Sequence, residues 1–312
     1  MKYILSFCFF IFIFVSYYLV ADELKKMISS AKPGKKVVVI TGVSRGIGLV
    51  TAEHLAEQGY IVYGTVRESS DTTQFDIASK QYPENLFKIV TSLTDENLIT
   101  TSFEAIVKNH GRIDVLINNA VMFLMGTAES TTVQEQKELF DINFFGPVRT
   151  IQAVLPSMRE KKNGMIINIS SDADISPYSP MEVYSASKYA LRGLSESLSA
   201  TLSPWNIKVS IIELSSVNTV DGNRVPVGTR FQGKHNPYAL FHDVEQSVDG
   251  DDPKDLAKFI ESIIESPATH VRHQFGAFAE MRAKEIYIDP SGDEALKSNI
   301  EYYRSMGLLP DR

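Results

Sequence analysis

The sequence predicts an α/β fold in which short strands and helices alternate along a single domain. Two patterns carry this prediction: apolar, β-branched runs that recur along the chain, and segments with helical apolar spacing that follow them. The first run, residues 37–40, leads directly into a glycine-rich turn at 42–48 and then into a helical pattern. Length is the third observation, because 312 residues suit one large α/β domain with appendages better than two independent cores.

The same patterns place the other elements along the chain. Strands are expected at residues 60–66, 86–91 and 113–118, in the apolar run that ends at Ser170 and Ser171, and at 206–213 and 271–275. Helices are expected at 95–109 with an acidic first turn, across 132–160, around residues 184–188 and at 252–266. Residues 277–312 are rich in charge and are expected to form a helical extension of unknown role.

The turn at residues 42–48 has the features of a site for a pyrophosphate group. In a strand–turn–helix unit of this kind, backbone N–H groups and the positive end of the helix dipole point toward a bound anion. Gly42 permits the tight turn, Gly46 a close approach of the backbone and Gly48 close packing of the helix on the sheet. A glycine-rich turn without flanking elements is more often a plain loop, but here both elements are present.

Tyr184 and Lys188 have the spacing of a proton-transfer pair. Four residues apart on a helix, they lie on one face. A fixed ammonium favours the phenolate and is expected to lower the pKa of Tyr184 from its usual value of about 10. Tyr184 could then act as a general acid or base near neutral pH. The alternative is an exposed helical pair without function, so the neighbouring motifs decide.

The two motifs together resemble those of one enzyme family. The turn has the spacing Gly-x-x-x-Gly-x-Gly rather than Gly-x-Gly-x-x-Gly, and it precedes the Tyr-x-x-x-Lys pair. This combination resembles the short-chain dehydrogenase/reductase family, in its single-domain branch, over approximately residues 35–275. The resemblance implies a Rossmann-type, doubly wound parallel sheet, with a nicotinamide cofactor across the carboxyl ends of the strands.

The resemblance also implies a set of catalytic residues. Ser171 matches the family's catalytic serine, which orients the reacting oxygen of the substrate, and Ser170 is the second choice for that role. Asn143 matches an asparagine that helps to hold a water relay to Lys188. Tyr184 is expected to move the hydroxyl proton, while Lys188 tunes it and holds the ribose. The plain alternatives are a turn residue for Ser171 and a helix-kinking residue for Asn143.

The end of the second strand bears on the choice of cofactor. A chain selective for NAD(H) would place Asp or Glu there, but this strand ends at Arg67, and Arg45 lies inside the glycine turn. Two guanidinium groups suit a 2′-phosphate, so NADP(H) is expected rather than NAD(H). Glu68, directly after Arg67, weakens this expectation slightly, and Arg67 could simply be solvated. The expected cofactor-binding residues are Gly42, Ser44, Arg45, Gly46, Ile47, Gly48, Arg67, Asn119, Ala120, Tyr184, Lys188, Val217 and Thr219.

Three positions depart from the family pattern. Val121 follows Asn118-Asn119-Ala120 where the family has glycine, and Ser92 stands where the family has an aspartate near the adenine. Leu214-Ser215 replaces the family's Pro-Gly after the sixth strand. These changes are expected to alter loop geometry and cofactor affinity, and they leave the reacting groups in place.

Composition and charge exclude several classes of function. A net charge of −7 without a basic cluster argues against nucleic-acid binding. Cys8 is the single cysteine, so an intrachain disulfide, thiol catalysis in the body of the protein and a cysteine-built metal site are excluded. The histidines show no ligand spacing with carboxylates, and no metal site is expected.

The N-terminal segment is expected to attach the protein to a membrane. Residues 3–20 are uncharged and strongly apolar, and as a helix they would span about 27 Å, just enough to cross a hydrocarbon core. An uncleaved anchor is favoured over a signal peptide, because small residues before a cleavage site are scarce. Lysines concentrated after the segment predict a cytoplasmic catalytic domain; the alternative is a secreted or lumenal protein after cleavage.

The expected substrate is a lipophilic alcohol or carbonyl compound. Residues 221–248 lack periodicity but carry apolar side chains, which is typical of a substrate lid, although a loose surface insertion is the alternative. The anchor, the NADP-type corner and residues 63–67 resemble the retinol and 17β-hydroxysteroid dehydrogenase group, which implies a retinoid- or steroid-like substrate and a possible homodimer or homotetramer. Two alternative functions are a membrane-tethered, cofactor-binding scaffold or sensor without turnover and a nucleotide-sugar epimerase or dehydratase. The expected organisation is an anchor or signal at 1–21, a tether at 22–35, a catalytic domain at 36–276 and an extension at 277–312.

Overall fold

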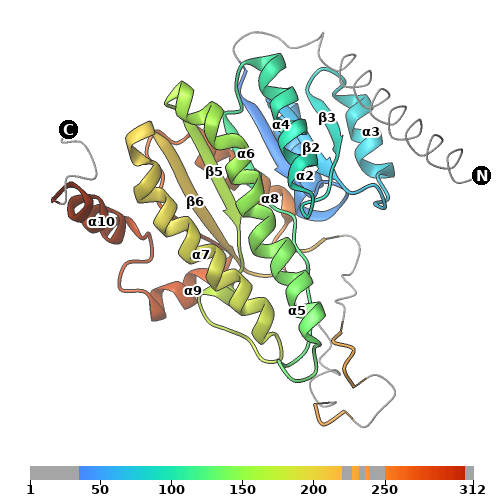
Figure 1. Cartoon of the computed structure of the whole chain (residues 1–312), viewed down its shortest axis with the longest axis vertical. Helices are drawn as coiled ribbons and strands as arrows, with labels where there is room; N and C mark the ends of the chain where they lie inside the picture. The colour runs from blue at the N-terminus through green and yellow to red at the C-terminus, as the bar shows by residue number, and fades with distance from the viewer. Residues whose placement is uncertain (1–34, 220–226, 232–235, 239–249, 306–312) are drawn as a thin grey trace, which may run out of the picture.

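A computed structural model of the chain describes residues 35–219, 227–231, 236–238 and 250–305. Its strands are β1 (Val37–Thr41), β2 (Ile61–Val66), β3 (Leu86–Val90), β4 (Val115–Asn118), β5 (Gly164–Ile169), β6 (Ile207–Leu214) and β7 (Arg272–Phe275). They form a seven-stranded parallel sheet in the order β3-β2-β1-β4-β5-β6-β7 (Figure 1). The order reverses between β1 and β4, and such a switch point is where a doubly wound sheet binds ligands. The predicted α/β fold and parallel sheet are confirmed.

Helices cover both faces of this sheet (Figure 1). They are α2 (Gly46–Glu57), α3 (Thr73–Gln81), α4 (Glu96–His110), α5 (Val133–Phe140), α6 (Gly146–Lys161), α7 (Glu182–Leu202), α8 (Pro253–Glu265), α9 (Ala277–Ile286) and α10 (Asp293–Ser305). Short 3-10 turns lie at Asp172–Asp174 and Ser203–Trp205. The predicted helices and strands are therefore present, with ends that differ from the expected ones by one or two residues in most cases.

The first strand shows why the sequence folds into three layers. Successive side chains of a strand point to opposite faces of the sheet. Val38 and Ile40 enter a core with α2, α3 and α8, whereas Val37 and Val39 enter a second core with α4, α6 and α7. Because both faces are covered, every residue of β1 is buried and the run is apolar throughout.

The long helical region predicted at 132–160 is confirmed, although it is not a single α-helix. A capping box between Thr132 and Glu135 starts α5, and a turn of π-helix at Asp141–Phe145 separates α5 from α6. Asn143 lies in this wider turn, and its side-chain amide pairs with the backbone of Met122 in the loop after β4. A tertiary contact of this kind is invisible to helical periodicity, and π turns are frequent at functional sites.

The C-terminal extension is helical where it is described, and it packs on the edge of the fold (Figure 1). Ala279 and Ala283 of α9, with Tyr287, contact Ile175 in the loop after β5. Residues 1–34, 306–312 and most of the expected lid lie outside the described residues. No helix in the described part of the chain is long and apolar enough to cross a membrane. The N-terminal anchor therefore stays a prediction.

Candidate active site

Three of the four predicted catalytic side chains meet where β5 ends and α7 begins. Tyr184 and Lys188 lie on the first turns of α7, and each is only 3% exposed. The Lys188 Nζ atom lies 5.8 Å from the centroid of the Tyr184 ring and donates a hydrogen bond of 3.0 Å to the backbone oxygen of Ile169. Ser171 begins the loop after β5 and hydrogen-bonds to the Tyr184 side chain. The tertiary fold thus brings a hydroxyl, a phenol and an amine together.

The pKa of Tyr184 is shifted upward, opposite to the predicted direction. Burial raises it most, the hydrogen bond with Ser171 lowers it, and the negative charges of Asp172 and Asp174 raise it further. Burial also lowers the pKa of Lys188 to about 8, against a smaller opposing effect of Asp174. Desolvation of the buried Tyr184 side chain is the largest of these effects, and it acts against the phenolate that Lys188 was expected to stabilise. At neutral pH the phenol of Tyr184 therefore carries its proton.

The two serines after β5 have different surroundings. Ser170 is buried, and its hydroxyl donates a hydrogen bond to the Asp174 carboxylate. Ser171 is half-buried, and its hydroxyl lies 3.1 Å from Asp172 Oδ1 and accepts a bond of 3.2 Å from the Ala173 N–H. Since Ser171 is the serine that also reaches Tyr184, the geometry favours Ser171 over Ser170 as the substrate-binding hydroxyl.

Both the oxygen and the nitrogen of the Asn143 side-chain amide form hydrogen bonds within the protein. Its Nδ2 donates to the Met122 carbonyl (2.9 Å) and to Ser187 Oγ (3.2 Å), and its Oδ1 accepts from the Met122 N–H (2.8 Å). Ser187 directly precedes Lys188 in α7. Asn143 therefore ties the loop after β4 to the helix that carries the reactive pair, and its role in a water relay stays a prediction.

The glycine turn has the backbone that a phosphate cradle requires. Gly42 and Gly46 adopt left-handed conformations, with φ of 75° and 62°. A Cβ atom at Gly42 would lie 2.8 Å from the Cβ of Ala120, and one at Gly48 would lie 2.5 Å from Asn119 Nδ2 and closer still to the Gly42 oxygen. Gly48 is thus required for contact with the turn itself rather than for helix-on-sheet packing alone.

The loop after β4 fixes the glycine turn in place. Asn119 Nδ2 donates to the backbone oxygens of Thr41 (2.9 Å) and Gly42 (3.1 Å). The N–H groups of Asn119 and Ala120 each donate to Thr41 Oγ1 at 3.0 Å. Sequence reasoning missed Thr41, although a hydroxyl residue directly before the first glycine is a signal that could have identified it.

The predicted 2′-phosphate site, formed by Arg45 and Arg67, is exposed to solvent. Gly42 N bonds to Thr65 O at 3.0 Å, which brings the turn beside the end of β2. Arg45 and Arg67 are both exposed there, and within the described residues neither guanidinium forms a salt bridge or hydrogen bond. Two unpaired cations beside a helix N-terminus fit the phosphates of a dinucleotide.

The remaining predicted cofactor contacts are distributed around the turn. Thr219 reaches it, because its Cγ2 would lie 3.4 Å from a Cβ atom at Gly46. Ile47 and Val217 pack against the core beneath α2. Ser44 is half-buried within the turn. These positions follow the carboxyl ends of β1 and β6, where a doubly wound sheet binds a dinucleotide.

The three departures from the family pattern have different structural consequences. Val121 is 40% exposed, so its side chain does not crowd the buried backbone. The Ser92 hydroxyl bonds to Thr94 Oγ1 at 2.8 Å. Ser215 Oγ accepts a bond of 2.9 Å from Ala279 N, which joins the segment after β6 to α9. The replacement of Pro-Gly thus creates an attachment point for the C-terminal extension.

A buried carboxyl pair behind the catalytic loop was not predicted from the sequence. Asp174 and Glu213 are fully buried, and burial raises the pKa of both, with the Glu213 charge adding to the effect on Asp174. Glu213 accepts hydrogen bonds from Tyr287 Oη (2.9 Å) and from Gln274 Nε2 (2.6 Å). Arg192 bonds to both the Asp174 carbonyl and the Tyr287 hydroxyl. The cluster connects the extension to the loop that carries Ser171.

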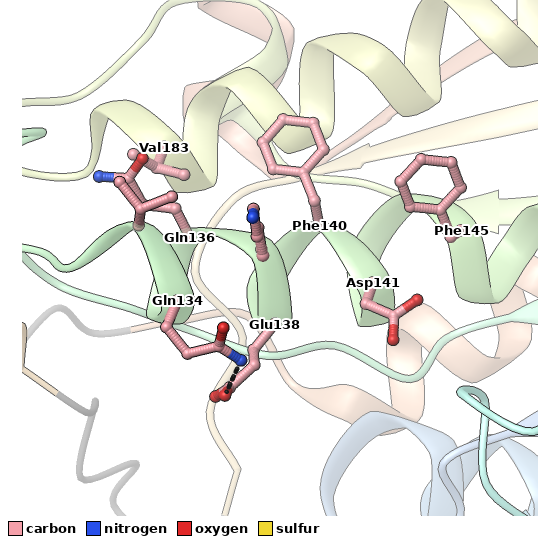
Figure 2. Close-up of a pocket in the computed structure, with 9 residues that line it drawn as sticks. Gln134, Gln136, Glu138, Phe140, Asp141, Phe145 and Val183 are labelled. Atoms are coloured by element: carbon pink, nitrogen blue, oxygen red, sulfur yellow. Dashed lines mark hydrogen bonds between the residues drawn. The ribbon is translucent and has the colours of Figure 1, made fainter.

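A surface pocket of about 490 Å³ lies on α5, the π turn and the start of α7. Its lining residues are Val133, Gln134, Gln136, Lys137, Glu138, Phe140, Asp141, Phe145 and Val183, and Figure 2 shows the bond between Gln134 and Glu138. None of them is a predicted site residue. Two of its lining residues, Phe140 and Val183, also belong to the apolar cluster that contains Tyr184.

Comparison with known proteins identifies the family. Residues 36–225 match the sequence model described as short chain dehydrogenase. The chain belongs to the short-chain dehydrogenase family. It is 40% identical to a 3-ketodihydrosphingosine reductase of Bacteroides thetaiotaomicron over 59% of this chain and 65% of that protein. It is 32% identical to retinol dehydrogenase 8 of Bos taurus over 82% of this chain and 86% of that protein. The resemblance deduced from the motifs is confirmed.

Solved structures support the same assignment. A short-chain dehydrogenase from Streptomyces avermitilis is 30% identical and superposes with a TM-score of 0.73, covering 90% of this chain and 100% of that one. The closed form of a serine dehydrogenase complexed with NADP+ is 26% identical, with a TM-score of 0.65 over 77% of this chain and 94% of that one. This short-chain dehydrogenase is therefore an oxidoreductase of the family that acts on CH–OH-type groups.

Proposed function

We propose that this protein is an NADP(H)-dependent oxidoreductase that interconverts a lipophilic alcohol and the corresponding ketone or aldehyde. The observation that carries the proposal is the meeting of Tyr184, Ser171 and Lys188 beside the carboxyl end of β5, next to the glycine turn. A buried phenol that hydrogen-bonds a half-exposed hydroxyl can place one proton on the oxygen of a bound carbonyl group.

The chain's own residues would divide the work of a carbonyl reduction. The Tyr184 Oη atom donates a proton to the carbonyl oxygen, and Ser171 Oγ holds that oxygen while negative charge develops on it. Lys188, whose pKa is lowered to about 8, would supply the proton that replaces the one given up by Tyr184. The nicotinamide cofactor, when bound, would supply the hydride that reaches the carbonyl carbon and would itself be oxidised.

NADP(H) is favoured over NAD(H) by the corner at Arg45 and Arg67. Arg67 rather than a carboxylate directly follows β2, although Glu68 comes next, and within the described residues neither guanidinium group has a partner that would keep it from a phosphate. The serine dehydrogenase described above was solved with NADP+, which agrees with this choice.

A lipophilic substrate is supported by the surroundings of Tyr184. Its ring stacks on Phe123 with centroids 4.7 Å apart, and both belong to an apolar cluster. The other members of this Tyr184 cluster are Met122, Leu124, Leu139, Phe140, Ala173, Tyr178, Met181 and Val183. The relatives named for retinol and 3-ketodihydrosphingosine act, by those names, on lipid-like compounds. A retinoid, a steroid or a long-chain ketone would suit such a surface.

Attachment to a membrane through residues 1–21, with the catalytic domain on the cytoplasmic side, is part of the proposal. Its support is the uncharged apolar run at residues 3–20 and the excess of lysine that follows it. Fractionation of the full chain, followed by protease treatment of sealed vesicles, tests it. Release of the catalytic domain into the lumen or the medium would favour the signal-peptide alternative.

The activity itself is tested with the full chain in detergent micelles. The oxidation of NADPH is followed while retinal, a steroid ketone and a long-chain ketone are supplied in turn. We expect turnover with at least one of them, and its loss in Tyr184→Phe while that variant still binds NADPH. Binding of NADPH without turnover of any carbonyl compound would instead support a cofactor-binding scaffold.

A further inference from the structure

Asp172 places a carboxylate beside the atoms expected to hold the substrate oxygen. Its Oδ1 lies 3.1 Å from Ser171 Oγ, and its Oδ2 accepts a hydrogen bond of 2.7 Å from Tyr178 Oη. Because Ser171 is expected to bond the substrate oxygen directly, that oxygen would lie within about two hydrogen-bond lengths of the carboxylate. Asp172 is therefore close enough to the reacting carbon to contact a group on the next carbon.

Within the described residues the Asp172 carboxylate forms no ion pair. Asp172 is 8% exposed. Arg282 is near enough for its charge to lower the pKa of Asp172, but the Arg282 guanidinium donates its hydrogen bond to Ser176. Lys188 bonds to the Ile169 carbonyl. An unpaired buried charge is costly, so a cation arriving with a ligand would bind there favourably.

The carboxylate also borders the apolar surface that would receive a lipid chain. Tyr178, which donates to Asp172, belongs to the Tyr184 cluster, as does Ala173, the next residue along the chain. The site therefore combines a carboxylate that forms no ion pair within the described residues with the apolar cluster around Tyr184. Burial raises the pKa of Asp172, and a neighbouring ammonium would oppose that shift and keep the carboxylate ionised.

We propose that Asp172 selects long-chain ketones that carry an ammonium group on the carbon next to the carbonyl. The inference rests on the proposed carbonyl reductase function of the same site. In such a compound only three bonds separate the nitrogen from the carbonyl oxygen, so the oxygen can meet Ser171 and Tyr184 while the ammonium meets Asp172. The bond to Asp172 is charge-assisted and stronger than one to a neutral hydroxyl group. Anionic substrates are disfavoured by the same charge.

The test compares two ketones that differ only in the amine. The full chain in detergent micelles, with NADPH, is given 3-ketodihydrosphingosine and its deaminated counterpart of equal chain length, 1-hydroxyoctadecan-3-one. We expect a higher kcat/KM for the amino ketone, and we expect Asp172→Asn to reduce that preference by about 30-fold or more. The neighbouring variant Tyr178→Phe keeps the carboxylate and should retain most of the preference.

The outcomes distinguish this inference from the function on which it rests. Turnover of the deaminated ketone without a preference for the amino ketone would overturn the role of Asp172 and leave the reductase function standing. An equal loss on both ketones in Asp172→Asn would show a structural role only and would also overturn it. No turnover of any ketone would overturn both proposals.

A second measurement needs no variant and guards against a misfolded Asp172→Asn protein. N-acetylation of 3-ketodihydrosphingosine removes the positive charge and keeps the ketone and the alkyl chain. We expect the wild-type kcat/KM to fall by about 30-fold or more on the acetylated compound. An undiminished value would overturn the proposal.

Discussion

Replacement of Gly48 by alanine should disable the glycine turn, and the size of the effect follows from two contacts. The new Cβ atom would lie 2.5 Å from Asn119 Nδ2 and closer to the Gly42 oxygen. Asn119 would have to move and give up its bonds to the Thr41 and Gly42 oxygens, at roughly 0.5–1.5 kcal/mol each. Overpacking adds about 1–3 kcal/mol, and the better helix propensity of alanine returns about 1 kcal/mol. The free energy of unfolding should therefore fall by about 1–5 kcal/mol.

A matched variant makes this prediction specific. Gly193 lies inside α7, and a Cβ atom there would meet nothing within 4 Å. Gly193→Ala should therefore raise the free energy of unfolding by about 0.5–1 kcal/mol. Both variants are measured by urea denaturation and by NADPH fluorescence titration, and only Gly48→Ala should lose affinity. If Gly48→Ala is as stable as the wild type and binds NADPH equally well, the inferred close contact in the turn is wrong.

Three further predictions concern the candidate site. Tyr184→Phe should abolish detectable turnover, a loss of at least about 100-fold, without weakening NADPH binding in a fluorescence titration; residual rates near the wild type would contradict its role as proton donor. Arg67→Ala should raise the Kd for NADPH by about 10-fold and leave that for NADH almost unchanged, and equal losses would contradict the 2′-phosphate corner. The pKa of Lys188 is lowered from 10.5 to about 8, so between these values the unfolded chain binds more protons. The contribution of Lys188 to stability should therefore rise with pH across that window, and urea denaturation of Lys188→Met should lack this component; parallel pH profiles of the two proteins would argue against the shift.

Local patterns were sufficient to predict the sheet and the glycine turn. The β-branched run at β1 is apolar because both of its faces are covered, and Gly42 is required by a left-handed backbone in a strand-to-helix turn. Tyr184, Lys188 and Ser171 were found because the family's spacing fixes them, and the fold brings the three together. Information of this kind is contained in short stretches of sequence, so a single chain reveals it.

Features that depend on burial and on distant partners could not be predicted in the same way. The π turn at Asn143 depends on the backbone of Met122, far away in the sequence. The direction of the Tyr184 pKa shift was wrong because it is set chiefly by desolvation in the finished fold. Asp174 and Glu213 are ordinary acidic residues in the sequence, and only the structure shows that they share one buried site.

The attachment of the C-terminal extension makes the chemistry of the site depend on residues beyond 225, where the family match ends. Tyr287 donates a hydrogen bond to Glu213, whose charge acts on Asp174, and the charge of Asp174 in turn raises the pKa of both Tyr184 and Lys188. The extension is thus part of the low-dielectric surroundings of this carboxyl pair. A change in the charge of the pair would therefore shift the pKa values of Tyr184 and Lys188. In a protein shortened to the residues of the family match, the pKa values of Tyr184 and Lys188 would differ, even with every catalytic residue retained.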